Sequence, residues 1–157
     1  MKQTLFLMAS LLLLLTVNSC QSTNNRIANN MKERINTSNA PAAIGPYSQA
    51  IDSGHGLIFV SGQLPIDPAT GSFPEGGVKE QTRQSLTNAK AILEAAGLSL
   101  DNVVKTTVFL SEIANFGPMN EVYAEFFTAP FPARCAFAVK DLPKAALVEI
   151  ELIAEAQ

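Results

Sequence analysis

The sequence contains one histidine, His55, and two cysteines, Cys20 and Cys135, among its 157 residues. These three side chains are too few to make a multi-histidine metal site, a pair of catalytic imidazoles or a disulfide framework. A serine hydrolase is also disfavoured, because Ser61 ends a predicted strand and no histidine is available to activate it. His55 stands between two glycines, which predicts a turn residue.

Charge is also sparse in this sequence. Charged residues make up 16%, and 11 Lys and Arg against 14 Asp and Glu give a formal net charge of -3. The basic residues form no cluster that would neutralise several neighbouring phosphates, so we expect no nucleic acid partner. Hydrophobic residues reach 47%, which excludes a disordered chain and, at this length, predicts one globular domain.

The N-terminus has the pattern of an export signal. Lys2 precedes an apolar run over residues 5–17, which is too short to span a bilayer comfortably and is typical of a secretory signal. The run ends in Val17-Asn18-Ser19-Cys20, which resembles the bacterial lipobox, where cleavage falls just before a cysteine that becomes lipid-modified. A plain signal peptide cut after Ser19 is the alternative. Both interpretations predict an exported protein, and the first predicts a lipoprotein anchored by Cys20, facing the periplasm or the cell exterior.

We therefore expect three regions along the chain. Residues 1–19 form the signal peptide. Residues 20–38 comprise the lipidated cysteine and a flexible tether, because they are mostly Asn, Ser, Thr and charged residues with little to bury. Residues 39–157 form the folded domain.

Hydrophobic periodicity predicts the elements of this domain. One helix is expected over residues 78–96, with Gly97 as its left-handed C-terminal cap. A second helix begins at Pro118 and ends before Pro130. The order of elements predicts an α+β layer, a mixed sheet with two helices packed on one face. Strands are expected at residues 48–52, 57–60, 103–110, 133–139 and 147–154.

The strand at 133–139 suggests that the other face of the sheet is covered. Its residues alternate between a set with Cys135 and Phe137 and a set with Arg134, Ala136 and Ala138. The second set is small and nearly uncharged, whereas a fully wet face more often carries Lys, Glu or Thr. We expect another subunit to cover the face that holds Arg134, and we expect Cys135 to point into the apolar core.

Three residues are candidates for chemistry. The planar guanidinium of Arg134 would fix a carboxylate with two parallel hydrogen bonds; the alternative is a structural salt bridge to Glu149 or Glu151. Glu149 would orient or deprotonate a water, or else it is a solvated strand residue. Tyr47 follows a Gly-Pro turn and would cap a pocket, or else it serves packing.

The motifs of the domain resemble a known family. The similarity runs from about Asn39 to Ala154, nearly the whole domain, and it identifies a member of the Rid family of reactive-intermediate imine deaminases, also called YjgF-type or L-PSP proteins. The matching segments are Ala40-Pro41-Ala42-Ala43-Ile44-Gly45-Pro46-Tyr47-Ser48-Gln49, Ser61-Gly62-Gln63, Gln84-Ser85-Leu86-Thr87-Asn88, Glu94-Ala95-Ala96-Gly97, Val104-Lys105-Thr106-Thr107-Val108-Phe109-Leu110, Phe131-Pro132-Ala133-Arg134, Leu142-Pro143 and Glu149-Ile150-Glu151.

The resemblance implies a chorismate-mutase-like fold assembled as a homotrimer, with ligand clefts between neighbouring subunits. It implies a 2-iminobutanoate/2-iminopropanoate-type deaminase that hydrolyses reactive enamines and imines to 2-keto acids and ammonia, without metal or organic cofactor. In that family setting Arg134 clamps the substrate carboxylate, Glu149 positions the attacking water and Tyr47 lines the cleft from across the interface. Ala136, through its backbone N–H, and Ser61 with Gly62 complete the expected substrate-binding set.

Two features depart from the family pattern. Many members carry a cysteine two residues after the arginine, where this chain has Ala136, and Cys135 follows Arg134 directly. The export signal is the second departure, since archetypal members work in the cytosol. Two alternatives therefore stay open: a ribonuclease or translation inhibitor, as the L-PSP name suggests, and a non-catalytic envelope module that binds a small carboxylate.

Overall fold

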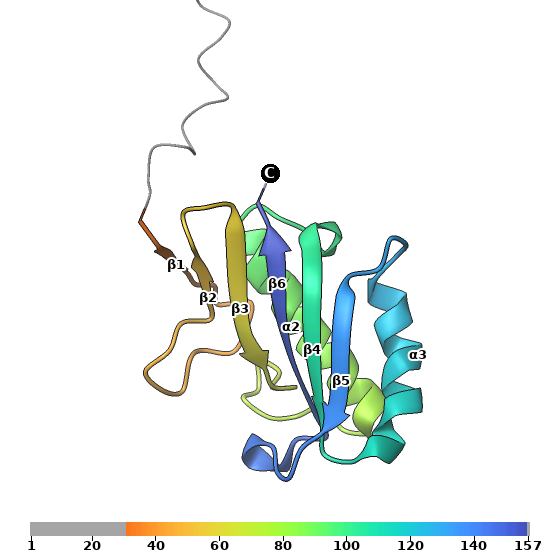
Figure 1. The fold of residues 1–157 in the computed structure, drawn as a ribbon. Coiled ribbons are helices and arrows are strands. Elements are labelled where there is room, and N and C mark those ends of the chain that lie inside the picture. The colour runs from red at the N-terminus through yellow and green to blue at the C-terminus, as the bar shows by residue number, and fades with distance from the viewer. Residues whose placement is uncertain (1–30, 157) are drawn as a thin grey trace, which may run out of the picture. The chain divides into compact units, whose positions relative to one another are not determined.

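The computed structural model describes residues 31–156, which form one mixed sheet with two α-helices (Figure 1). The sheet has the strand order β1-β2-β3-β6-β4-β5. The strands are β1 (Glu33–Ile35), β2 (Ala50–Asp52), β3 (Leu57–Gln63), β4 (Val103–Leu110), β5 (Ala133–Ala138) and β6 (Val148–Glu155). The helices are α2 (Val78–Ala95) and α3 (Phe116–Phe126), with short 3-10 turns η1 (Leu100–Asn102), η2 (Ile113–Asn115) and η3 (Pro143–Ala145).

The sheet is antiparallel except at one edge. β6 lies between β3 and β4 and runs antiparallel to both, whereas β5 runs parallel to β4. The parallel pair arises because α3 carries the chain back between β4 and β5, the crossover that a parallel connection requires. The predicted α+β layer with both helices on one face is confirmed, and Figure 1 shows α2 behind the central strands.

Helix α2 forms because its apolar residues recur on one face. Leu86, Ala89, Ile92 and Leu93 are fully buried against the sheet. The helix ends in a Schellman motif: the N–H of Leu98 donates to the carbonyl of Leu93, and Gly97 adopts a φ of 74°. The predicted cap at Gly97 is confirmed.

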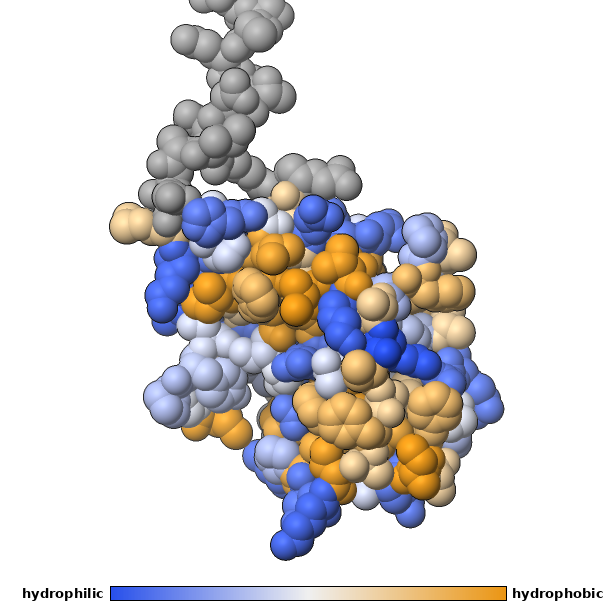
Figure 2. Space-filling model, in the orientation of Figure 1, coloured by the Kyte–Doolittle hydropathy of each residue, from blue (hydrophilic) through white to orange (hydrophobic). Residues whose placement is uncertain are grey.

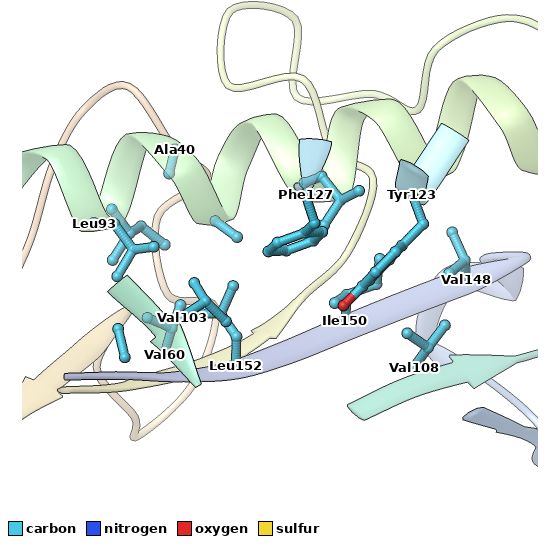
Figure 3. Packing of buried hydrophobic residues seen from close by; sticks show 14 of the residues in the cluster. Ala40, Val60, Leu93, Val103, Val108, Tyr123, Phe127, Val148, Ile150 and Leu152 are labelled. Atoms are coloured by element: carbon cyan, nitrogen blue, oxygen red, sulfur yellow. The ribbon is translucent and has the colours of Figure 1, made fainter. Parts of the chain in front are cut away.

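Helix α3 closes the core at the β5 edge of the sheet. Met119, Val122 and Tyr123 are its buried residues, and Figure 3 shows Tyr123 and Phe127 among the side chains that pack above Ile150 and Val148 of β6. The helix begins at Phe116 rather than at Pro118, since η2 leads directly into it. No helix within residues 31–156 is long and apolar enough to cross a membrane.

Strand β1 lies inside the stretch expected to be a flexible tether. Glu33–Ile35 pairs antiparallel with β2, with Ile35 opposite Ala50, and Ile35 packs partly buried against the core. The sheet therefore begins before Asn39, the expected start of the domain, since residues 33–35 add an edge strand to it. The expected signal peptide and Cys20 fall outside the described residues.

Strand β5 presents its faces in the opposite way to the prediction. In its register with β4, Arg134 lies beside Thr106, which is fully buried on the helix side, so Arg134 also faces the helices. Cys135 is exposed on the open face, and its Sγ accepts a hydrogen bond from Lys105 Nζ at 3.1 Å. The expectation that Cys135 points into the core was wrong. Both alternating sets of β5 are mainly apolar, so their composition did not settle which set faces the helices. Phe116 and Tyr123 of α3 lie over the face that holds Arg134, where we had expected another subunit.

The open face of the sheet is partly apolar. Phe59 and Phe137 are 45% and 46% exposed there, and the Phe137 ring meets Phe109 edge to face at 5.5 Å. Figure 2 views this face and shows two apolar groups with a hydrophilic band between them. A sheet face of this composition is suited to contact with another protein surface.

Candidate functional site

A pocket of about 310 Å³ lies where the loop over residues 41–47 meets the end of β3. Apolar side chains that include Ile44, Leu64 and Pro143 line much of it, and Tyr47 and Glu149 are its titratable groups. This volume is at the small end of the range for ligand pockets, and an apolar wall with few polar groups is the usual composition of such a site.

One side of the pocket is lined by a segment of β3 where its pairing with β6 is irregular. The register runs Val60 opposite Leu152 and resumes with Gln63 opposite Ile150, so β3 holds one extra residue between these pairs. Ser61 and Gly62 occupy this β-bulge. Ser61 turns back to the loop, where its N–H donates to the Gln49 carbonyl at 3.0 Å and its hydroxyl donates to the Ser48 carbonyl at 2.7 Å.

Glu149 brings a carboxylate into this pocket from β6. The residue is partly exposed, and no Lys or Arg within residues 31–156 forms an ion pair with it. Burial raises the pKa of Glu149 above its ordinary value, and the like charge of Glu151 adds to the increase. A carboxyl group with a raised pKa in a pocket has the property that a general base needs near neutral pH.

Tyr47 stands at the mouth of the pocket on a loop that the fold holds in place. The N–H of Ile44 donates to the Tyr47 hydroxyl at 3.3 Å, and the N–H of Tyr47 donates to the Gly45 carbonyl at 2.8 Å. The buried amide of Gln49 fixes the start of the loop by donating to the Pro41 carbonyl at 2.8 Å. Tyr47 is 49% exposed, so its ring is available to a ligand or to another chain.

Arg134 lies away from this pocket, on β5 and on the helix side of the sheet. Its guanidinium carbon lies 4.5 Å from the centre of the Tyr123 ring and 5.7 Å from that of Phe116. The Tyr123 hydroxyl is hydrogen-bonded to Thr106 Oγ1 at 2.8 Å, and burial raises the pKa of Tyr123, so the ring is a neutral phenol. No Asp or Glu within the described residues pairs with Arg134, so the alternative of a salt bridge to Glu149 or Glu151 of the same chain is not found.

The predicted site residues therefore form two groups in one chain. Tyr47, Ser61, Gly62 and Glu149 line the pocket, whereas Arg134 and Ala136 lie on β5 at the sheet edge. Glu149 is opposite Phe109 on the open face, and Arg134 is on the other face with β4 between the two strands. Within one chain, the sheet therefore separates Arg134 from Glu149.

Sequence reasoning missed two contributors to these groups. It did not identify Tyr123 as the ring beneath Arg134. It also did not identify Gln49 as the residue that holds the pocket loop. Neither role has a local sequence signal, since both depend on segments brought together by the fold. Across residues 31–156, no group of three or more His, Cys, Asp or Glu side chains is placed to hold a metal ion.

Comparison with known proteins agrees with this architecture. Residues 37–156 match the family model described as Endoribonuclease L-PSP, which is most of the chain. The chain belongs to this family. As an L-PSP family member it is 58% identical, over 79% of its length and 98% of the relative, to the RutC family protein PH0854 of Pyrococcus horikoshii.

Two further L-PSP family relatives carry more specific names. The 2-iminobutanoate/2-iminopropanoate deaminase of Escherichia coli K12 is 51% identical over 79% of this chain and 98% of its own length. The crystal structure of E. coli TdcF with bound serine matches with a TM-score of 0.76 at 44% identity, covering 80% of this chain and 99% of TdcF. At these identities and coverages the relatives share nearly all of the described residues.

Proposed function

We propose that this protein is an imine deaminase that hydrolyses reactive 2-imino and 2-enamino acids to 2-keto acids and ammonia. The relative at 51% identity named 2-iminobutanoate/2-iminopropanoate deaminase supports this proposal. The serine in the TdcF structure supports a small amino-acid-like ligand. The observation that carries it furthest is the Glu149 carboxylate in a pocket that no Lys or Arg of residues 31–156 lines.

The split site favours a cleft between subunits of a homotrimer. Among residues 31–156, Glu149 has no cationic partner and Arg134 has no anionic partner, and the two lie on opposite faces of the sheet. One substrate bound between two chains would give both residues a partner. Arg134 of one chain would bind the substrate carboxylate, and Glu149 of the neighbouring chain would lie beside the reacting carbon. The partly apolar open face, with Phe59 and Phe137 exposed, supports association of chains in the same way.

The chemistry is modest enough for these residues. In the balanced reaction R–C(=NH₂⁺)–COO⁻ and H₂O give R–CO–COO⁻ and NH₄⁺. The iminium carbon is already electrophilic, so the site has only to orient the water and accept its proton. Glu149 takes that proton as the C–O bond forms, and the proton is then available to the nitrogen that leaves as ammonia. The reaction needs neither a metal nor an organic cofactor.

The remaining site residues would orient the substrate. The Arg134 guanidinium donates two parallel hydrogen bonds to the carboxylate, and the backbone N–H of Ala136 adds a third donor. Tyr47, Ser61 and Gly62 line the neighbouring pocket and would contact the substrate from across the interface. These roles follow from family membership together with the placement of each residue.

Turnover of a freshly generated imine tests the proposal. An amino-acid dehydratase supplies the 2-imino acid in situ, and the accelerated release of keto acid or ammonia is followed for the wild type, Arg134→Ala and Glu149→Gln. We expect acceleration by the wild type and its loss in both variants. Wild-type rates in either variant would contradict the assigned mechanism.

Parallel measurements separate the alternatives. Calorimetric binding of simple 2-keto acids with no imine turnover would favour a non-catalytic binding module. Cleavage of RNA by the wild type would favour a ribonuclease. The net charge of -3 argues against that function, because RNA is itself negatively charged.

We also propose that the protein is exported and held at a membrane by lipid on Cys20. The apolar run over residues 5–17 followed by Val17-Asn18-Ser19-Cys20 supports this. Metabolic labelling with a fatty acid should label the wild type and not Cys20→Ser. A chain that is exported but never labelled would indicate a plain signal peptide cut after Ser19.

A further inference from the structure

Gly62 of β3 lies directly against the side chain of Glu149. A Cβ added to Gly62 would lie 3.0 Å from Cδ and 3.2 Å from Cγ of Glu149, and it would overlap Oε1 more severely still. Cβ atoms in proteins rarely approach other atoms as closely as 3.0–3.2 Å. Any side chain at residue 62 would therefore displace the Glu149 carboxylate.

The backbone of Gly62 does not by itself call for glycine. Its φ lies outside the left-handed region, whereas Gly76, which also contacts a glutamate, Glu80, has a φ of 116°. At Gly76 both the positive φ and the close Glu80 side chain favour glycine. At Gly62 only the close Glu149 side chain does. The φ of Gly62 is open to other residues, and the three atoms nearest to an added Cβ all belong to the Glu149 side chain.

We propose that Gly62 is a positioning residue, whose missing side chain lets the Glu149 carboxylate lie against the β3 bulge inside the pocket. This inference rests on the proposed function, in which Glu149 accepts the proton of the attacking water. The bulge itself supports it, because Gly62 falls between the paired residues Val60 and Gln63, where the strand departs from regular pairing with β6. A methyl group at residue 62 would turn the carboxylate outward to solvent.

Two consequences follow for Glu149 in Gly62→Ala. The carboxylate moves away from the reacting carbon, and displacements of this size reduce rates by roughly 10- to 100-fold. The pKa of Glu149 also returns toward its ordinary value, since the burial that raises it is lost. The other titratable groups near Glu149 are Glu151 on the same strand and Tyr47 across the pocket.

A set of four variants in the full-length protein tests the inference. Gly62→Ala, Glu149→Ala and the double variant are compared with Gly117→Ala, a matched control in α3 whose added Cβ meets no atom within 4 Å. We measure imine turnover, thermal midpoints, and the titration of the Glu149 carboxyl carbon by NMR. We expect Gly62→Ala to lose roughly 10- to 100-fold in kcat and to shift the Glu149 titration to lower pH, with Gly117→Ala like the wild type.

The double variant separates a role through Glu149 from a general structural role. Once Glu149 is alanine, Gly62→Ala should leave the thermal midpoint unchanged, because the obstructing atoms are gone. An equal fall of the thermal midpoint in both backgrounds would overturn the inference, as would a Gly62→Ala protein with wild-type kcat and an unchanged titration. If Gly62→Ala alone does not fold, a folded double variant supports the inference and an unfolded one overturns it.

The same experiment distinguishes failure of the proposed function. Wild-type turnover in Glu149→Ala would remove Glu149 from the mechanism. The NMR titration of Gly62→Ala would still show whether Gly62 sets the position of that carboxylate.

Discussion

At the scale of residues, the guanidinium of Arg134 rests on an aromatic ring and pairs with no carboxylate within residues 31–156. Its guanidinium lies over the Tyr123 ring at 4.5 Å, a cation–π contact worth about 0.5–2 kcal/mol. Stacking uses the face of the guanidinium and leaves the N–H donors around its edge available for a carboxylate. Thr106 holds the ring in turn through the hydrogen bond to the Tyr123 hydroxyl.

Substitutions of Tyr123 should separate the ring from the hydroxyl. Tyr123→Phe keeps the ring beneath Arg134 but leaves Thr106 Oγ1 buried without its partner, so we expect about 1 kcal/mol lower unfolding free energy with KM unchanged. Tyr123→Leu removes the ring and should raise KM several-fold. Denaturant unfolding and steady-state kinetics measure the two effects, and an unchanged KM in Tyr123→Leu would contradict a positioning role for the ring.

The pH dependence of turnover should report Glu149. A base must be deprotonated, so activity is present above the pKa of Glu149 and is lost as the pH falls through it. Burial raises that pKa, so the acid limb of kcat/KM should lie above the pH at which an exposed glutamate titrates. Glu149→Gln should lose most of the activity, and its residual kcat/KM should no longer show this acid limb. An acid limb that persists in the residual rate would arise from another group.

At the scale of elements, the two helices are fixed against each other and against the sheet. Lys79 pairs with Glu121 and Arg83 pairs with Glu125 through two bonds of 2.5 and 2.9 Å, linking successive turns of α2 and α3. These groups are exposed, so they align the helices more than they stabilise them. The buried face of α2 contributes more to stability, because it packs against the sheet, and the Schellman motif ends the helix at Gly97.

The C-terminus of α2 should be sensitive to Gly97→Ala. Gly97 has a φ of 74°, where a Cβ costs roughly 1–2 kcal/mol, so the unfolding free energy should fall by that amount. Gly117→Ala is the control, because Gly117 lies inside α3 outside the left-handed region and alanine favours a helix. Equal stability changes in both variants would contradict a role for the left-handed cap.

At the scale of the whole molecule, the distribution of site residues over two faces is the main constraint on function. Glu149 and Arg134 are separated by β4 and by the plane of the sheet. In the proposed trimer, each cleft contains Arg134 from one chain and Glu149 from the neighbouring chain. The activity should therefore belong to the assembly and not to the single chain.

Mixed assemblies test this constraint directly. Arg134→Ala and Glu149→Gln subunits should each be inactive alone, yet equal amounts unfolded and refolded together should regain about a quarter of the wild-type rate, since one cleft in four receives both intact residues. Light scattering on the same samples should give three times the chain mass. Failure of the mixture to regain any activity while it forms trimers would place both residues in the same cleft from the same chain.

Much of this protein could be predicted from the sequence because its local signals are strong. The 3.6-residue period of Leu86, Ala89 and Leu93 and the glycine after them were enough to predict α2 and its cap. The family motifs were enough to identify Arg134, Glu149 and Tyr47 as candidates. The start of the sheet at Glu33 was not predictable, since a three-residue edge strand among polar residues has no pattern of its own.

Local patterns therefore determined the elements and their order, because period and turn residues act within a few positions of the chain, and the family motifs supplied the candidate site residues. Only the tertiary structure decided which way β5 faces, that Arg134 rests on Tyr123, and that Gly62 lies against Glu149. Alternation along a strand defines two sets of side chains but not which set meets the helices. That choice depends on packing between segments far apart in the sequence, and it separates the two halves of the site.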